Sequence, residues 1–299
     1  MTSFVRERQT PVNFPVPAGA CDCHTHVYLD EARYPMDPAR KYTPPLASEE
    51  ELLALQKFLG FDRVVIVQPS NYGTDNAATL QGVKFLGLGR ARAVAGIDAR
   101  TTSAQLDSYH AQGVRGVRVN LALAENVEPA AVAKRLHATA EQLKGRGWHI
   151  QIVTHIHVIA ALKNELSSLP LPVVIDHFGY PKLGQGLGQA GYDVLVDLVR
   201  SGACHVKISG AYRCSSDAPD FPDMKPLAQA LITANPDRIV WGTDWPHPDG
   251  HVQGVPPTEV TPNIVVDDGA LLNQLAVWAP DAALRKKILV DNPARLYDF

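Results

Sequence analysis

The sequence predicts an α/β fold, a single-domain (β/α)8 TIM barrel, and three observations carry this prediction. Eight apolar segments rich in β-branched residues alternate with helical segments over about 250 residues, which is typical of the barrel. Some segments are continuously apolar, as in residues 63–69 (RVVIVQP), and such runs indicate strands buried on both faces of a parallel sheet. No Gly-x-Gly-x-x-Gly motif follows the first strand, which disfavours the alternative, an open doubly wound sheet.

The composition narrows the class of protein. Apolar residues make up 45% and charged residues 20% of the 299-residue chain, as in globular proteins. A net charge of −3 argues against a nucleic-acid partner. We expect no membrane partner and a cytoplasmic location, because no apolar run is long enough to span a bilayer and no signal peptide is apparent. The four cysteines form no C-x-x-C pair, so disulfides are not expected. The oligomeric state is left open, a homo-oligomer included.

The first half of the chain begins with an extended lead over residues 1–19, where three prolines exclude regular helix, and the barrel domain covers residues 20–299. Ser48 and Glu51 form a capping box that opens the first helix, and Thr102 and Gln105 form another. The predicted strands of this half cover residues 21–27, 63–69, 91–97 and 114–121, and the helices between them include residues 75–86 and a helix that ends at Gly113.

The second half continues the alternation. A helix begins near Pro129, a residue favoured in the first helical turn, and ends by Gly145 or Gly147. The predicted strands cover residues 148–155, 172–177, 204–209 and 238–244, and the helices cover residues 158–166, 192–200 and 226–234, before a long loop and C-terminal helices.

Polar side chains gather where the first strand ends. His24 and His26 are two residues apart, so on a strand they point to the same face, with Cys21 and Cys23 on the opposite face. Two imidazoles that face one cavity can bind a metal ion or polarise a substrate oxygen.

The other predicted strands also end in polar residues, and in a barrel the functional groups lie at these C-terminal ends. His155 shares a face with Gln151 and Val153 if the fifth strand extends that far. The candidates at the remaining strand ends are Ser70, Thr74, Arg118, Asn120, His177, Arg213, Asp244 and His247.

These motifs resemble the amidohydrolase superfamily. The resemblance rests on His24-Thr25-His26 and on residues 242–247 (GTDWPH). Residues 73–76 (GTDN), 113–120 (GVRGVRVN) and 174–179 (VIDHFG) are similar to the amidohydrolase-2 branch, which includes 2-pyrone-4,6-dicarboxylate hydrolase and sugar-acid lactonases. The similarity covers about residues 18–297.

The resemblance implies a hydrolase that opens the lactone ring of a small carboxylated lactone or pyrone. It implies that His24, His26 and His177 polarise the carbonyl, that Asp244 takes a proton from water, and that Arg118 and Arg213 hold a carboxylate. Lactone opening requires such a base and such donors, and the planar fork of arginine suits a carboxylate. The further expected substrate contacts are Ser70, Thr74, Asn120, His155 and His247.

Two alternatives use the same residues. One is a lactone isomerase, in which a substrate hydroxyl replaces water, and the other is a non-catalytic carboxylate-binding barrel. The resemblance also implies a further arginine six residues after Arg118, but position 124 is Ala. This departure favours a substrate whose acidic groups are arranged differently from those of the pyrone dicarboxylate.

The sequence also bears on whether the site needs a metal ion. Metal-dependent relatives usually carry a histidine on the fifth strand, at a position that corresponds to Val153 here. The sequence therefore favours a site without a cofactor. The alternative is one divalent metal ion, Zn²⁺, held by His24, His26, His155 and Asp244.

Overall fold

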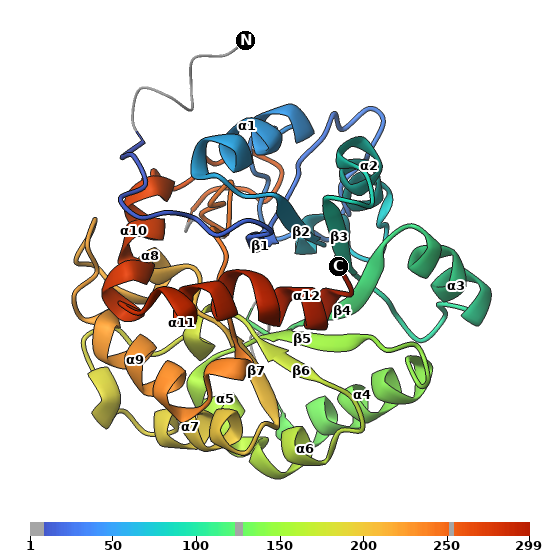
Figure 1. Cartoon of the computed structure of the whole chain (residues 1–299). Coiled ribbons are helices and arrows are strands. Elements are labelled where there is room, and N and C mark those ends of the chain that lie inside the picture. The colour runs from blue at the N-terminus through green and yellow to red at the C-terminus, as the bar shows by residue number, and fades with distance from the viewer. Residues whose placement is uncertain (1–8, 123–127, 251–253) are drawn as a thin grey trace.

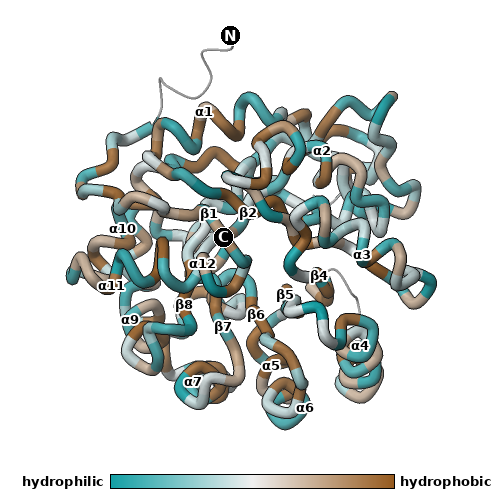
Figure 2. The backbone as a smooth tube through the Cα atoms, turned by 45° about the vertical axis from the view of Figure 1, so that its right-hand side comes forward, coloured by the Kyte–Doolittle hydropathy of each residue, from teal (hydrophilic) through white to brown (hydrophobic). Residues whose placement is uncertain are grey.

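A parallel sheet of eight strands in the order β1 to β8 forms the centre of the computed structural model, which describes residues 9–122, 128–250 and 254–299 (Figure 1). Backbone hydrogen bonds from Cys23 N to Trp241 O (2.9 Å) and from Asp244 N to His24 O (2.8 Å) join the two outermost strands of the sheet. The sheet therefore closes into a barrel. The helices form a ring around it, with apolar stretches among the strands (Figure 2), and the predicted (β/α)8 fold is confirmed.

The observed strands match the predicted ones but most are shorter at their C-terminal ends. They are β1 Cys21–Thr25, β2 Arg63–Val67, β3 Ala91–Ala95, β4 Val114–Asn120, β5 His149–Val153, β6 Val173–Ile175, β7 Cys204–Lys207 and β8 Ile239–Val240. The largest difference is in β8, predicted to extend to residue 244. After Val240 the chain still bonds to β1 through Asp244 N, but Thr243 N donates to the side chain of Asp22 (3.0 Å).

The helices also follow the prediction, with two differences. The main ones are α1 Glu49–Leu59, α2 Ala77–Leu86, α3 Ser103–Ala111, α4 Pro129–Gln142, α5 Ile156–Ala161, α6 Lys163–Ser168, α7 Tyr192–Arg200, α8 Ala211–Cys214, α9 Met224–Ala234, α10 Asp268–Trp278, α11 Ala282–Lys286 and α12 Asn292–Tyr297. Both predicted capping boxes are present. The single helix expected over residues 158–166 is two helices, because the backbone leaves helical geometry at Leu162. The short helix α8 was not predicted.

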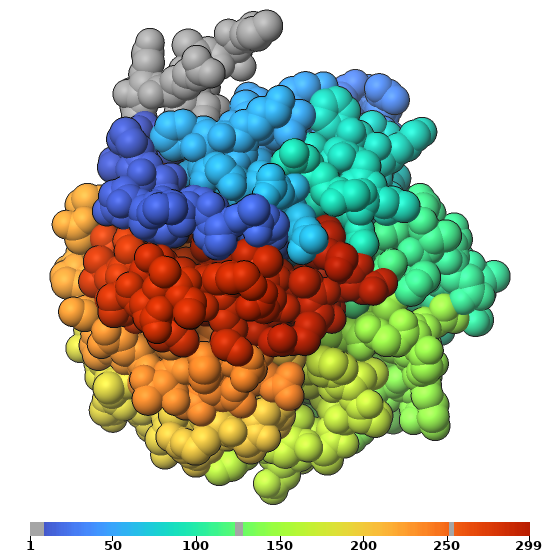
Figure 3. Space-filling view, viewed as in Figure 1, coloured from blue at the N-terminus to red at the C-terminus, as the bar shows by residue number. Residues whose placement is uncertain are grey.

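One end of the barrel is covered by the chain, and this determines at which end the site can lie. Interior valines of several strands pack with Leu296 and Tyr297 of α12. Asn292 of α12 also donates to Ile239 O at the start of β8 (2.7 Å). Helix α12 therefore covers the end at which the strands begin, and the C-terminal helices cross this face in Figure 3. The opposite end, where the strands finish, is left for the functional groups.

The expected orientation of Cys21 and Cys23 is wrong. Both pack in the interior cluster with Val65, Val67 and Val94 instead of on the face opposite His24. The pairing of β1 with β2 shifts between Asp22 and Thr25. This bulge interrupts the alternation, so the side chains before and after it both lie inside the barrel.

The N-terminal lead packs along α10. Thr10 N donates to the carboxylate of Asp267 (2.9 Å), and Asn13 N donates to the side chain of Asn273 (2.8 Å). Residues 1–8 of the expected lead lie outside the described residues. In the described part of the chain, no helix is long and apolar enough to cross a membrane. The division into lead and barrel and the cytoplasmic location stay predictions.

Candidate active site

Three histidine rings surround one carboxylate oxygen at the open end of the barrel. Asp244 Oδ1 lies 3.6 Å from His24 Nε2, 3.5 Å from His26 Nε2 and 3.9 Å from His177 Nε2. All four side chains are buried. The structure thus brings the four predicted catalytic residues together, with the Nε2 atoms of His24 and His26 both directed at Asp244.

Local backbone geometry makes this convergence possible. A side chain at Gly242 would approach His24 N to 2.6 Å, so only glycine lets the chain after β8 lie this close to β1. His177 (φ 50°) and Asp244 (φ 67°) both adopt the left-handed region, two residues after β6 and four residues after β8. Such conformations are disfavoured for residues with side chains and concentrate at functional sites. Here the imidazole and the carboxylate face each other, with His177 Nε2 at 3.9 Å from Asp244 Oδ1.

The second oxygen of Asp244 accepts two strong hydrogen bonds. Tyr212 Oη donates to Asp244 Oδ2 at 2.7 Å and Arg213 Nε donates to it at 2.5 Å. Burial alone would raise the pKa of Asp244, but Arg213 and His177 outweigh it and hold that pKa well below its usual range. Asp244 is therefore an ionised carboxylate with one oxygen fixed and the other directed at the imidazoles.

A polar contact at Nδ1, the ring nitrogen that faces away from Asp244, fixes the orientation of each imidazole. Nδ1 of His26 lies 2.7 Å from Val67 O, and Nδ1 of His24 lies 3.3 Å from Asp176 Oδ1. Nδ1 of His177 lies 3.0 Å from Ser209 Oγ. A carbonyl oxygen only accepts, so His26 Nδ1 carries the hydrogen. Burial lowers the pKa of all three histidines, that of His177 to about 4. A neutral His26 therefore turns the lone pair of Nε2 toward Asp244.

This donor set is suited to a metal ion. Ligand atoms of His24, His177 and Asp244 lie within 4.8 Å of one another. Within the described residues, His24 Nε2 is buried and has no hydrogen-bond partner. Imidazole nitrogens and a carboxylate oxygen are the ligands that Zn²⁺ accepts. The group could hold a divalent ion.

His155 does not belong to this group, which corrects the alternative ligand set. Strand β5 ends at Val153, so its alternation does not extend to His155. His155 instead precedes α5 and is exposed, with its ring stacked on His157 at 5.9 Å and 5.7 Å from that of Tyr180. It lies at the rim, beyond the ring of Tyr180.

A buried polar network lies beneath His24. Lys207 Nζ donates to Gln151 Oε1 (2.7 Å) and to Cys23 O (2.8 Å), and it lies 3.7 Å from Asp176 Oδ1. Gln151 also donates to Asp176 Oδ2 (3.0 Å). Burial would raise the pKa of Asp176, but His24 and Lys207 hold it well below its usual range. Through these contacts Gln151, Asp176 and Lys207 support His24.

Two residues expected to contact substrate have protein partners instead. The guanidinium of Arg213 pairs with Asp244, and its Nη2 donates to Pro248 O (3.0 Å). His247 Nε2 lies 3.1 Å from Asp268 Oδ1, and its Nδ1 lies 3.3 Å from Tyr212 Oη. His247 therefore supports Tyr212, which holds Asp244. Sequence reasoning missed Tyr212, which follows β7 in a short helix without a repeating pattern.

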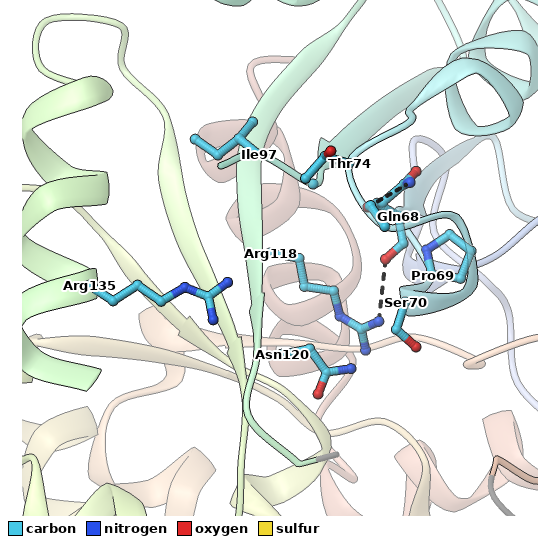
Figure 4. Close-up of a pocket in the computed structure, with 10 residues that line it drawn as sticks. Gln68, Pro69, Ser70, Thr74, Ile97, Arg118, Asn120 and Arg135 are labelled. Atoms are coloured by element: carbon cyan, nitrogen blue, oxygen red, sulfur yellow. Dashed lines mark hydrogen bonds between the residues drawn. The ribbon is translucent and has the colours of Figure 1, made fainter. Parts of the chain in front are cut away.

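Four expected substrate contacts, but not His155, line a cavity of about 200 Å³ beside the imidazoles (Figure 4). Arg118 lies between this cavity and the buried network beneath His24. Its Nη1 donates to Gln68 O at the cavity (3.3 Å), and its Nε lies 3.5 Å from Asp176 Oδ2 in the network. Ser70, Thr74 and Asn120 complete this set. Ala124, where the family arginine is missing, lies outside the described residues.

Comparisons with known proteins show what the whole chain is similar to. The family model described as Amidohydrolase matches residues 21–299. The chain is 36% identical to the 4-sulfomuconolactone hydrolase of Rhizobium radiobacter over 98% of its own length and 94% of the relative's. It is 34% identical to the 2-pyrone-4,6-dicarboxylate hydrolase of Comamonas testosteroni, over 95% of this chain and 92% of the relative. It is 32% identical to the D-galactarolactone isomerase of Agrobacterium fabrum, over 99% of this chain and 97% of the relative. A solved structure from Pseudomonas putida, described as a 2-pyrone-4,6-dicarboxylic acid hydrolase, superposes with a TM-score of 0.75 at 31% identity (94% and 97%).

Proposed function

The chain belongs to the amidohydrolase family, and on this premise we propose that it hydrolyses the ring ester of an anionic lactone or pyrone. The observation that carries the proposal is the convergence of three imidazole Nε2 atoms on one oxygen of an ionised, buried Asp244. Relatives that match almost the whole chain act on lactones by name, and they support the same substrate class.

Asp244 is the proposed base. Tyr212 and Arg213 fix one of its oxygens, which leaves Oδ1 to accept a proton from water at the mouth of the barrel. In the proposed reaction water adds to the lactone carbonyl carbon and its proton passes to Asp244. The ring C–O bond then breaks, and the ring oxygen receives that proton from Asp244. The base and acid steps need only this one carboxyl group.

The sequence favoured a metal-free site, but the position of the ring hydrogen on the imidazoles favours a bound cation. With its hydrogen on Nδ1, neutral His26 has no N–H to donate to a carbonyl from Nε2. Protonation would supply one, but burial opposes it. We therefore propose that His24, His177 and Asp244 hold a divalent ion such as Zn²⁺, with His26 beside it. Bound there, the ion would act as a Lewis acid toward the carbonyl and make the attacking water more acidic.

Arg118 is the proposed contact for the carboxylate of the substrate. It reaches the cavity from β4 while it stays close to Asp176, so an anion bound by Arg118 would lie beside the imidazoles. Ser70, Thr74 and Asn120 supply neutral donors around it. We propose that Arg213 mainly orients Asp244 and reaches the substrate only with its remaining N–H groups.

The experiment is a screen of carboxylated and sulfonated lactones and pyrones, read by acid release. We expect at least one of them to be opened by the wild-type protein and by a control variant at exposed Glu50 (Glu50→Gln). We expect none to be opened at a comparable rate by Asp244→Asn. Acid release that is unchanged in Asp244→Asn would overturn the role of the carboxylate, and no release from any anionic lactone would overturn the proposed activity.

A lactone isomerase is the second candidate, because a relative named as such is 32% identical over 99% of the chain. In that reaction a hydroxyl group of the substrate attacks the carbonyl carbon, and Asp244 takes the proton of that hydroxyl. The original ring C–O bond then breaks, and the released ring oxygen receives that proton from Asp244. The product is another lactone, so no acid is released. A change in the NMR spectrum of a hydroxylated lactone without acid release would favour this candidate.

A further inference from the structure

The cavity beside the imidazoles carries more positive charge than one carboxylate needs. It lies at the ends of β2, β3 and β4 and is lined by Arg118, Arg135 and eight uncharged residues. Within the described part of the chain, no acidic residue lines it. Arg135 belongs to α4 and points toward Asn120 and Arg118 in Figure 4. The cavity thus receives two guanidinium groups from two different elements.

The two arginines differ in their protein contacts. Arg118 is 10% exposed and lies beside Asp176, which compensates part of its charge. Arg135 is exposed, and among the described residues it has no hydrogen-bond or ion-pair partner. By contrast, Arg115 pairs with Asp298, and Arg146 pairs with Asp107. The guanidinium of Arg135 is therefore available to a ligand in the cavity.

We propose that Arg135 binds a second acidic group of the substrate, a carboxylate or a sulfonate, and makes the enzyme selective for lactones that carry two anionic groups. This inference rests on the proposed lactone hydrolysis. Arg118 holds the acidic group nearer to the imidazoles, and Arg135 holds the one at the outer end of the cavity. A planar guanidinium offers paired N–H donors to the oxygens of either kind of acid.

The path of the chain places this contact on α4. Arg135 is on the helix that follows β4 along the chain, and it reaches the same cavity as Asn120 at the end of that strand.

The kinetic test compares two substrates and three variants. The substrates are 2-pyrone-4,6-dicarboxylate and its analogue with a single carboxylate, 2-pyrone-6-carboxylate. We expect Arg135→Met to raise KM for the diacid about 10- to 100-fold, as for the loss of a charge-assisted hydrogen bond, with the KM for the monoacid within about twofold. Arg135→Lys should recover part of the loss. The adjacent exposed Lys134 supplies the control, since Lys134→Met removes the same charge outside the cavity.

A binding test keeps the inference separate from the proposed activity. Benzene-1,3-dicarboxylate and benzoate, which are not hydrolysed, are titrated calorimetrically into the wild-type protein and each variant. We expect the dicarboxylate to bind at least about tenfold more tightly than benzoate, and Arg135→Met but not Lys134→Met to abolish this preference. If the wild-type protein has no preference, or if Arg135→Met keeps it, the role of Arg135 is overturned even if lactones are hydrolysed. If no lactone is hydrolysed but the preference depends on Arg135, only the proposed activity fails.

Discussion

The buried carboxylate of Asp22 accepts hydrogen bonds from both the backbone N–H (3.0 Å) and the hydroxyl (2.7 Å) of Thr243. The same carboxylate accepts from His24 N (3.2 Å) and from Gln56 of α1 (3.0 Å). Thr243 directly precedes Asp244, so one side chain on β1 fixes the backbone on which the carboxylate and the first imidazole are placed. The contact lies where the register of β1 shifts and where the chain has left β8.

We predict that Asp22→Asn destabilises the protein by about 2 kcal/mol and lowers kcat. The amide replaces one accepting oxygen by a donor, which leaves a buried N–H or O–H group of Thr243 or Gln56 without an acceptor. Chemical denaturation measures the free energy of unfolding, and the exposed Glu50→Gln serves as the matched control. Stability and kcat equal to those of the control would show that Asp22 does not position the site.

Asp244→Asn is expected to lower kcat by about 10²- to 10⁴-fold, because the amide cannot take a proton from water. Circular dichroism and the unfolding midpoint should show that the variant still folds. Tyr212→Phe, which removes only one hydrogen bond to the same carboxylate, is expected to have a smaller effect. A Tyr212→Phe loss equal to that of Asp244→Asn would contradict the assignment of the base.

Metal content is predicted to depend on His24 and His177 and not on His155. Elemental analysis of the purified protein should give about one equivalent of a divalent ion, lowered by His24→Ala or His177→Ala. His155→Ala serves as the control because His155 is exposed and lies outside the ligand group. Full metal content in His177→Ala, or its loss in His155→Ala, would contradict the proposed ligands.

Stability is predicted to fall in mild acid because of His149, which is buried at the start of β5. Burial lowers the pKa of His149 from 6.5 to about 3. The unfolded chain therefore binds a proton below pH 6.5 that the folded chain does not, and stability is lost as the pH falls from about 6.5 toward 3.

His149→Phe keeps the ring against Tyr297 and removes this titration. We expect the free energy of unfolding to fall less steeply between pH 6 and 4 in this variant, by up to about 1.4 kcal/mol per pH unit. His137→Gln, at an exposed position of α4, should keep the wild-type slope. Identical slopes in His149→Phe and the wild-type protein would show that His149 does not carry the effect.

The sequence indicated the barrel and the set of Asp244 and three histidines because these depend on local patterns. Strand periodicity and the rule that functional groups follow strand ends bring His24, His26, His177 and Asp244 to one end of the barrel. The place of His155 could not be predicted in this way, because β5 ends at Val153, two residues before the predicted end of the strand.

The supporting contacts depend on distances that sequence spacing does not specify. His247 reaches Asp268 across 21 residues of loop, and Asp22 reaches Thr243 across 221. Arg135 could not be selected from the sequence, because nothing in the pattern of α4 distinguishes it from the adjacent Lys134. Only the packing of α4 beside the end of β4 brings it to the cavity.

Lactone hydrolysis at Asp244 is tested most directly by a single turnover of an anionic lactone in H₂¹⁸O, with the enzyme in excess and the product analysed by mass spectrometry. We predict one ¹⁸O atom in the newly formed carboxylate, released by the wild-type protein and at a rate at least about 10²-fold lower by Asp244→Asn. A ring-opened product without ¹⁸O in that carboxylate, or equal rates in the two proteins, would contradict water activation by Asp244.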